Sequence, residues 1–167
     1  AGRLDYIKGF DLLIKSWVDV EKSNLTLKLK IFGDGPEKES LERLIKKLKL
    51  KNITLSPATK NIKDELLNSC GYIMSSREEG MPMILLEAME CGLPIIAFKN
   101  SGSKFLVEDR FNGLICDLAD TAELSKNILY LAMNRNLTKS YGKASTVKVK
   151  EFYTDNLYHK WHEILNI

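Results

Sequence analysis

Two glutamates, Glu79 and Glu87, have the types and spacing that most directly suggest chemistry in this chain. Glu79 opens a Gly/Pro turn, and the apolar stretch 83–89 predicts a helix that ends before Gly92. Apolar residues on every side of this helix predict that the helix and the Glu87 carboxylate are buried. A buried carboxylate needs a partner, because unpaired burial is costly or shifts its pKa. Two interpretations stay open: a salt bridge to a core Lys or Arg, or hydrogen bonds to both carboxylates from the hydroxyls of a ligand.

Two basic residues, Arg3 and Lys8, lie at either end of a predicted strand-to-helix loop. Ordinary surface charge is one interpretation. The other is phosphate binding, with a planar fork from Arg and a point charge from Lys. Pro82 suits the first position of the following helix, whose N-terminus offers free N–H groups and the positive end of a dipole. These three sources of positive charge would neutralise a diphosphate without a metal ion.

The turn Gly33-Asp34-Gly35-Pro36 follows a predicted strand but departs from the dinucleotide fingerprint, because Lys38 stands where a third Gly is required. It is either a plain strand-to-helix connection or a place where two glycines let a ligand approach the backbone. The sequence contains neither a P-loop pattern nor a D-x-D, His or Cys cluster for a metal. His159 and His162 are expected to be ordinary surface or interface residues.

Strands are predicted to alternate with helices along the chain, and Asp120 with Glu123 is a predicted capping box. This order predicts an α/β fold: a Rossmann-like parallel sheet with helices on both faces and right-handed crossovers. Ligands bind at the carboxyl ends of such strands, where the loops 3–8, 33–35, 76–82 and 101–103 are expected. The expected strands are 27–32, 53–55, 72–74, 95–98 and 114–116, and the expected helices are 10–18, 41–48, 64–68, 83–89, 105–107, 124–131, 137–148 and 157–165.

The bulk composition is typical of one soluble domain of 167 residues with a net charge of +3. A nucleic-acid interface is not expected, because no basic stripe carries interleaved aromatic residues. No segment reads as a membrane span or a signal peptide. Cys70, Cys91 and Cys116 lie far apart and are expected to be free thiols in a reducing cytosol. The chain opens on Ala1 without an initiator Met, so we expect it to be part of a longer protein.

Four motifs in order resemble the second, donor-binding domain of GT-B glycosyltransferases of family 4, which are retaining and use nucleotide-sugar donors. The third of them is the family's E-x7-E motif with its following strand, and the resemblance covers nearly the whole chain. It implies one half of a GT-B architecture, with the acceptor-binding N-terminal domain absent from residues 1–167. The motifs are Gly2-Arg3-Leu4 with Lys8-Gly9-Phe10-Asp11-Leu12-Leu13-Ile14, Gly33-Asp34-Gly35-Pro36, Glu79 to Gly92 with Leu93-Pro94-Ile95-Ile96-Ala97, and Asn112-Gly113-Leu114-Ile115.

The resemblance implies a role for each candidate residue. Arg3 and Lys8 would bind the donor diphosphate and stabilise it as it leaves, and Glu79 would contact and orient the transferred sugar. Glu87 would accept hydrogen bonds from the ribose hydroxyls. The remaining donor-binding residues would be Gly33 and Gly35 at the nucleotide, Ser56 and Pro57 at the base, and Gly80, Met81, Pro82, Met83 and Ile84 at the sugar and phosphates.

The implied reaction moves a sugar from a nucleotide-diphosphate sugar, with UDP as the expected carrier, to a glycan, lipid-linked or other acceptor. No metal or other cofactor is expected. The expected location is the cytoplasm, with peripheral association of the full-length enzyme at the inner face of the membrane. The isolated domain is expected to bind a nucleoside diphosphate weakly and to transfer nothing.

The sequence departs from the family pattern at two places. The common E-G-F-G is here Glu79-Gly80-Met81-Pro82, and Pro82 has no N–H to offer a ligand. The acidic residue that the family usually carries near Lys104 and Phe105 is absent. Two alternatives to the transferase stay open: a GT-B sugar-nucleotide epimerase and a non-catalytic nucleotide-sugar binding module. A receiver domain is disfavoured, since no acidic cluster surrounds a candidate phosphoacceptor Asp.

Overall fold

The computed structural model describes residues 1–23 and 25–153. Strands and helices alternate along this part of the chain, which confirms the predicted α/β class. The helix expected over 157–165, together with His159 and His162, lies outside the described residues. The elements are η1 (Tyr6–Lys8), α1 (Phe10–Lys22), β1 (Leu29–Phe32), α2 (Lys38–Lys47), β2 (Ile53–Ser56), α3 (Ile62–Leu67), β3 (Tyr72–Met74), α4 (Met83–Glu90), β4 (Ile95–Phe98), α5 (Ser101–Leu106), β5 (Gly113–Cys116), α6 (Thr121–Met133), α7 (Arg135–Lys148) and η2 (Val149–Phe152).

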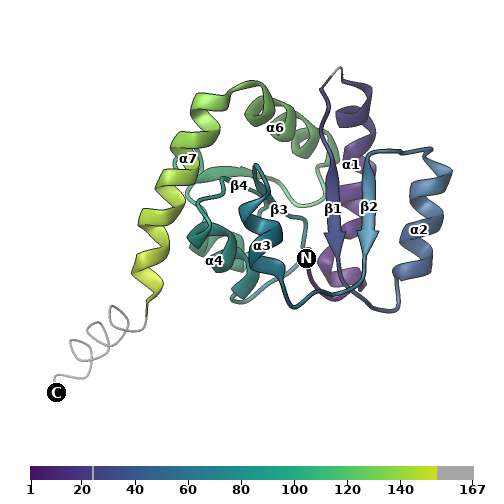
Figure 1. Cartoon of the computed structure of the whole chain (residues 1–167), viewed down its shortest axis with the longest axis horizontal. Helices are drawn as coiled ribbons and strands as arrows, with labels where there is room; N and C mark the ends of the chain where they lie inside the picture. Colours follow the sequence, from purple (N-terminus) through teal and green to yellow (C-terminus); the bar gives the residue numbers. More distant parts are fainter. Residues whose placement is uncertain (24, 154–167) are drawn as a thin grey trace.

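The strands form two parallel sheets, β1-β2 and β3-β4-β5, rather than the single sheet that the sequence predicts. Every strand pair is parallel, as expected, with Leu29 opposite Ile53 in the first sheet. The first residues of the chain lie along the edge of β1 that faces away from β2. There the Gly2 N–H donates to the Phe32 carbonyl at 2.9 Å, and Figure 1 shows the N-terminus between the two sheets. No ladder joins β1 to β3 among the described residues, so the sheet is interrupted at this place.

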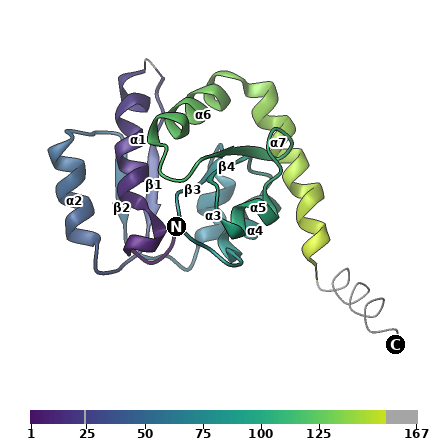
Figure 2. The same ribbon diagram turned by 180° about the vertical axis from the view of Figure 1, so that it is seen from behind.

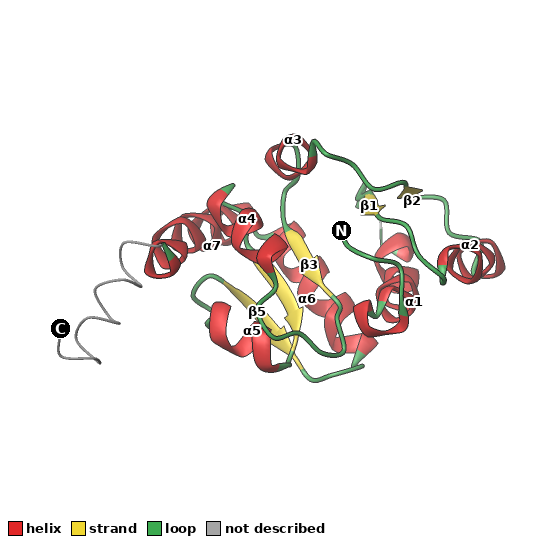
Figure 3. Cartoon of the chain, turned by 90° about the horizontal axis from the view of Figure 1, so that it is seen from below, coloured by secondary structure: helices red, strands yellow, loops and turns green. Residues whose placement is uncertain are grey.

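Helices cover both faces of the three-stranded sheet, as predicted. Side chains of β4 alternate between two core clusters, because successive residues of a strand point to opposite faces. Ile95 lies in the cluster with α4 and α5, whereas Ile96 and Phe98 lie in the cluster with α1 and α6. Figure 2 shows α1 beside α6, and Figure 3 shows α2 and α7 at opposite ends of the molecule.

Helix ends account for most differences from the expected elements. Helix α5 begins at Ser101, within the expected loop, because Asn100 and Ser103 form a reciprocal capping box. The capping box predicted for α6 is only half formed: Asp120 accepts from the Glu123 N–H at 2.8 Å, but the Glu123 carboxylate accepts from the Asp117 N–H instead. No helix of the described residues combines the length and apolarity that crossing a membrane requires.

The ends of α4 decide how the candidate site is presented. Pro82 is the N-cap residue, one position earlier than predicted. Gly92 ends the helix as predicted, with a positive φ of 72°. The Leu93 N–H donates to the Ala88 carbonyl at 3.1 Å and the Gly92 N–H to the Met89 carbonyl at 3.0 Å, which is a Schellman motif.

Candidate functional site

Helix α4 buries one stripe of its surface, not its whole circumference. Leu85, Ala88 and Met89 have no exposed area, because their spacing places them together against β3 and β4. Met83 and Glu87 are exposed. The prediction that Glu87 is a buried carboxylate is therefore wrong, and no core salt bridge is needed to explain it. Glu87 instead lines an open cavity of about 420 Å³ with Met83, Leu86, Glu90, Val149, Phe152 and Tyr153.

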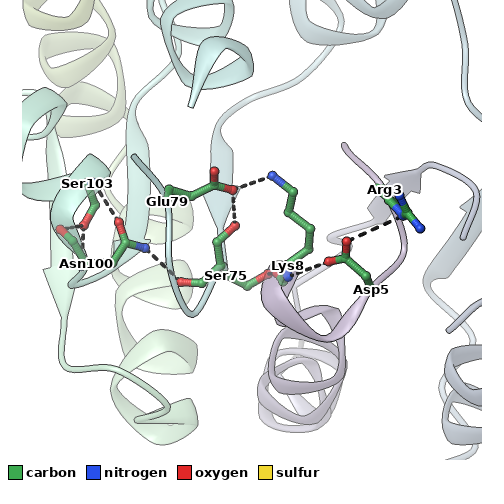
Figure 4. A network of polar contacts seen from close by, with 8 residues as sticks. Arg3, Asp5, Lys8, Ser75, Glu79, Asn100 and Ser103 are labelled. Atoms are coloured by element: carbon green, nitrogen blue, oxygen red, sulfur yellow. Dashed lines mark hydrogen bonds and ion pairs between the residues drawn. The ribbon is translucent and has the colours of Figure 1, made fainter. Parts of the chain in front are cut away.

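Glu79 is held in place by two donors on one of its oxygens (Figure 4). The Lys8 ammonium lies 2.5 Å from Oε1, and the Ser76 hydroxyl donates to the same oxygen at 2.8 Å. Only 14% of the Glu79 side chain and 26% of the Lys8 side chain are exposed, so this is a largely desolvated ion pair. The structure thus brings together two residues that lie 71 positions apart, one expected at the diphosphate and one at the sugar.

The start of α5 holds the turn that carries Glu79. The buried Asn100 amide donates from Nδ2 to the Ser76 carbonyl at 2.9 Å, and the Gly102 N–H donates to the Glu79 carbonyl at 2.8 Å. Gly102 has to be glycine, since a Cβ there would lie 2.7 Å from Pro82 Cδ and 2.9 Å from the Gly80 carbonyl oxygen. Figure 4 shows Asn100 between its cap partner Ser103 and this turn.

The turn that carries Lys8 lies against the end of β3. Asp5 caps η1, and its carboxylate accepts from the Lys8 N–H at 3.3 Å. Gly9 follows with a φ of 63°, and a Cβ there would overlap the Ser75 carbonyl. The Ser75 hydroxyl donates to the Lys8 carbonyl at 3.0 Å. A glycine is thus required at position 9 for the two segments to meet.

Arg77 adds contacts that the sequence analysis does not anticipate. Its guanidinium donates to Asp11 through two parallel bonds of 2.9 and 3.0 Å and to the Tyr6 carbonyl at 2.6 Å. The same group lies 3.8 Å above the Tyr6 ring. Burial by itself would raise the pKa of Asp11, but the bonds and charges of Arg77 and Lys15 outweigh it and hold that pKa below its usual value. Asp11 and Arg77 lie 66 positions apart, so no local sequence pattern signals the pair.

A second group of predicted site residues lies around the carboxyl ends of β1 and β2. The Gly33 N–H donates to the Ser56 carbonyl at 3.0 Å, next to the exposed Pro57. A Cβ on Gly33 would overlap the Gly2 carbonyl, so the backbone that approaches this glycine is the chain's own. Arg3 is 74% exposed, with its Nε 3.8 Å from Asp5.

Gly35 is crowded in the same way, since a Cβ there would overlap the backbone of Leu4. Asp34, between the two glycines, accepts a hydrogen bond from the Ala58 N–H at 3.0 Å. This bond is the main reason that the pKa of Asp34 is lowered, and Lys38 makes a smaller contribution. The loops after β1 and β2 are thereby joined.

The remaining predicted residues around Glu79 lie at or near the surface except Pro82, which is buried. Gly80 and Met81 are exposed, and Ile84 is half-buried. Phe105 is also exposed, and its ring contacts Phe152 edge to face with centroids 5.3 Å apart. The described residues hold no group of three His, Cys, Asp or Glu side chains that could bind a metal ion.

The three cysteines are free thiols, as predicted. Cys70 is exposed, and Cys116 is buried against the Ala97 carbonyl. Burial, with help from Glu123 and Asp120, raises the pKa of Cys116 to about 12, so this thiol stays protonated.

Comparisons with known proteins identify the family and the fold. A family model described as glycosyl transferases, group 1, matches residues 1–148. The chain is 34% identical over 167 residues to an uncharacterized glycosyltransferase of Haemophilus influenzae, covering 99% of this chain and 47% of the relative. It is also 34% identical over 170 residues to the amylovoran biosynthesis glycosyltransferase AmsD of Erwinia amylovora, again with 99% and 47% covered. The chain thus spans about half the length of these relatives.

Solved structures give the same result. A Staphylococcus aureus TarM variant in complex with Fondaparinux, alpha-GlcNAc-glycerol and UDP superposes with a TM-score of 0.89 at 26% identity, covering 99% of this chain and 35% of TarM. The architecture is that of GT-B glycosyltransferases, and the chain belongs to the glycosyl transferases group 1 family.

Proposed function

We propose that this chain is the donor-binding, C-terminal domain of a retaining family 4 glycosyltransferase that takes its sugar from a nucleotide diphosphate, UDP being the expected carrier. The Lys8–Glu79 pair carries the proposal, because it joins a cation suited to phosphate with a carboxylate suited to sugar hydroxyls. The family match and the UDP bound by TarM support it. The acceptor-binding domain would precede this chain in the complete protein.

In the proposed mechanism Lys8 keeps its contact with Glu79 and turns its remaining N–H donors to the diphosphate. Both contacts to Glu79 are made by Oε1, so Oε2 is the oxygen proposed to accept from a sugar hydroxyl. Arg3 and the first N–H groups of α4, at Met83 and Ile84, would add positive potential where the diphosphate leaves. The proposed mechanism uses no metal ion.

Glu87 is proposed at the ribose, since its exposed carboxylate on α4 is free to accept from two vicinal hydroxyls. Ser56 and Pro57 would face the base, with Gly33 and Gly35 beside the nucleotide. Gly80 and Met81 would complete the sugar and phosphate contacts before the N-cap Pro82. The complete enzyme is proposed to work in the cytoplasm, in peripheral contact with the inner membrane face, on a glycan or lipid-linked acceptor.

Calorimetric titration of this chain with UDP, UDP-sugars and GDP-sugars tests the donor site. We expect weak binding of at least one of them and no transfer by the domain alone. Lys8→Ala should weaken diphosphate binding by about 1–3 kcal/mol, the value of a charged hydrogen bond. The control is Lys22→Ala, which removes an exposed ion pair of α1 and should leave binding unchanged.

Absence of binding at millimolar ligand would contradict the donor site, and an unchanged affinity of Lys8→Ala would remove Lys8 from it. With the complete protein, epimerisation of a sugar nucleotide in the absence of any acceptor would favour the epimerase over the transferase.

A further inference from the structure

We propose that Arg77 is a positioning residue of the donor site, which clamps the turn carrying Lys8 onto the loop carrying Glu79. This role rests on the proposed function, because it acts on donor binding through Lys8. The residue lies in the loop after β3, two positions before Glu79, and 18% of its side chain is exposed. Its contacts all reach back to residues 6–11.

The turn that carries Lys8 cannot hold its own position by apolar packing. η1 is a single 3-10 turn of three residues, none of which is buried. Tyr6 and Ile7 are 64% and 53% exposed. So short a helix has little stability of its own. The buried Leu4 and Phe10 anchor the chain on either side of the turn, and between them polar contacts from neighbouring segments fix where the Lys8 side chain begins.

Arg77 supplies most of those contacts. Its backbone N–H donates to the Ile7 carbonyl at 2.7 Å, and its guanidinium donates to the Tyr6 carbonyl and stacks on the Tyr6 ring. Its fork on Asp11 ties the same group to the first turn of α1, just after Lys8. From the same loop the Ser75 hydroxyl donates to the Lys8 carbonyl, and the Glu79 carboxylate accepts from the Lys8 ammonium at the far end of that side chain.

The geometry also separates Arg77 from the ligand-binding cations. Its charge is neutralised by the two bonds to Asp11, and its donors point to groups of this chain. Lys8 in contrast reaches the carboxylate proposed to face the sugar. Arg77 thus acts through Lys8, and a Lys at position 77 could not replace it, because an ammonium lacks the planar fork.

A double-mutant cycle tests this role. UDP affinity is measured for the unchanged chain, Arg77→Gln, Lys8→Ala and the double variant. We expect Arg77→Gln to weaken UDP binding about tenfold, as for one charge-assisted hydrogen bond, and Arg77→Lys to rescue little of it. In the Lys8→Ala background the Arg77 change should have no further effect. Uridine, which lacks the diphosphate, should bind all four proteins alike.

Lys15→Ala is the matched control, since it removes the other, exposed partner of Asp11 and should leave UDP affinity unchanged. The positioning role would be overturned if Arg77→Gln reduced UDP affinity equally in the presence and absence of the Lys8 side chain. It would also be overturned if Arg77→Gln reduced the affinities for UDP and uridine equally.

A ligand-free measurement separates the clamp from the proposed function. Amide hydrogen exchange over 6–9 should become faster in Arg77→Gln and, to a lesser extent, in Arg77→Lys, while exchange in β4 stays unchanged. If no nucleotide binds the unchanged chain but this exchange still accelerates, the donor site is wrong and the clamp stands. Unchanged exchange over 6–9 in both variants would overturn the clamp.

Discussion

The two sides of the candidate site are built by different kinds of contact. The junction side consists of the segments 5–11, 75–82 and 100–103, and side chains join it through Glu79, Arg77 and Asn100. The glycine side consists of the segments 1–4, 33–36 and 56–58. Backbone bonds predominate on that side, such as Leu4 N–H to the Asp34 carbonyl at 2.9 Å, beside the bond that the Asp34 carboxylate accepts from the Ala58 N–H.

This difference separates the two proposed phosphate cations. Lys8 on the junction side is oriented by its contact with Glu79. Arg3 on the glycine side is 74% exposed and has only a 3.8 Å contact with Asp5. Ordering a long exposed side chain costs conformational entropy, whereas a side chain that is already fixed does not pay that cost on binding. The junction side is therefore the preorganised half of the site.

The largest expected effect on the junction side comes from Gly9→Ala. Position 9 has a left-handed backbone conformation that disfavours alanine, and the added Cβ would overlap the Ser75 carbonyl. We expect a loss of about 3 kcal/mol in the free energy of unfolding, measured by denaturant titration. Gly80→Ala is the control, since a Cβ there has nothing within 4 Å and should change stability by less than about 0.5 kcal/mol. Equal effects of the two substitutions would show that the close approach of the segments is not what fixes the junction.

A smaller loss is expected for Asn100→Ala. It removes the cap of α5 together with the buried bond to the Ser76 carbonyl, so we expect about 2 kcal/mol in the same measurement. Asn61→Ala is a matched control, because Asn61 is the N-cap of α3 but its side chain makes no cap bond. A loss as small as that of Asn61→Ala would mean that α5 does not hold the Glu79 turn.

The sequence predicts the elements of this fold where local chemistry determines them. Short apolar runs predict all five strands, and Gly92 predicts where α4 ends. Ser101-Gly102-Ser103 reads as a loop, yet it forms the first turn of α5, because the cap from Asn100 outweighs the low helix propensity of these residues.

The candidate site is predictable only in part, because its decisive contacts are long-range. Glu79 and Lys8 can be named from the sequence, but their pairing depends on two loops that meet in space. Arg77 gives no signal, since a charged loop residue is most often at the surface. Glu87 reads as buried from its apolar neighbours, but which side of α4 is covered depends on its contacts with the sheet.

The smallest expected effect concerns the Asp11–Arg77 pair and its dependence on pH. The pKa of Asp11 is lowered in the folded chain, so the folded state favours the ionised form. The pair therefore stabilises the fold above the ordinary Asp pKa, near 4, and this contribution is lost as the pH falls through the lowered value. Asp11→Asn should cost about 1 kcal/mol at pH 7, the upper end for such an ion pair. The difference from the unchanged chain should shrink as the pH falls below about 4.

Asp34 on the glycine side provides the comparison, because its pKa is also lowered but its carboxylate lies in solvent. Solvent screens that interaction, so Asp34→Asn should change the unfolding free energy less than Asp11→Asn at neutral pH, and the two variants should converge as the pH falls below about 4. Unfolding titrations of both variants between pH 7 and pH 3 compare them directly. If Asp34→Asn proved the more costly change at neutral pH, the glycine side would be the better anchored half, and the preorganised cation would have to be sought at Arg3.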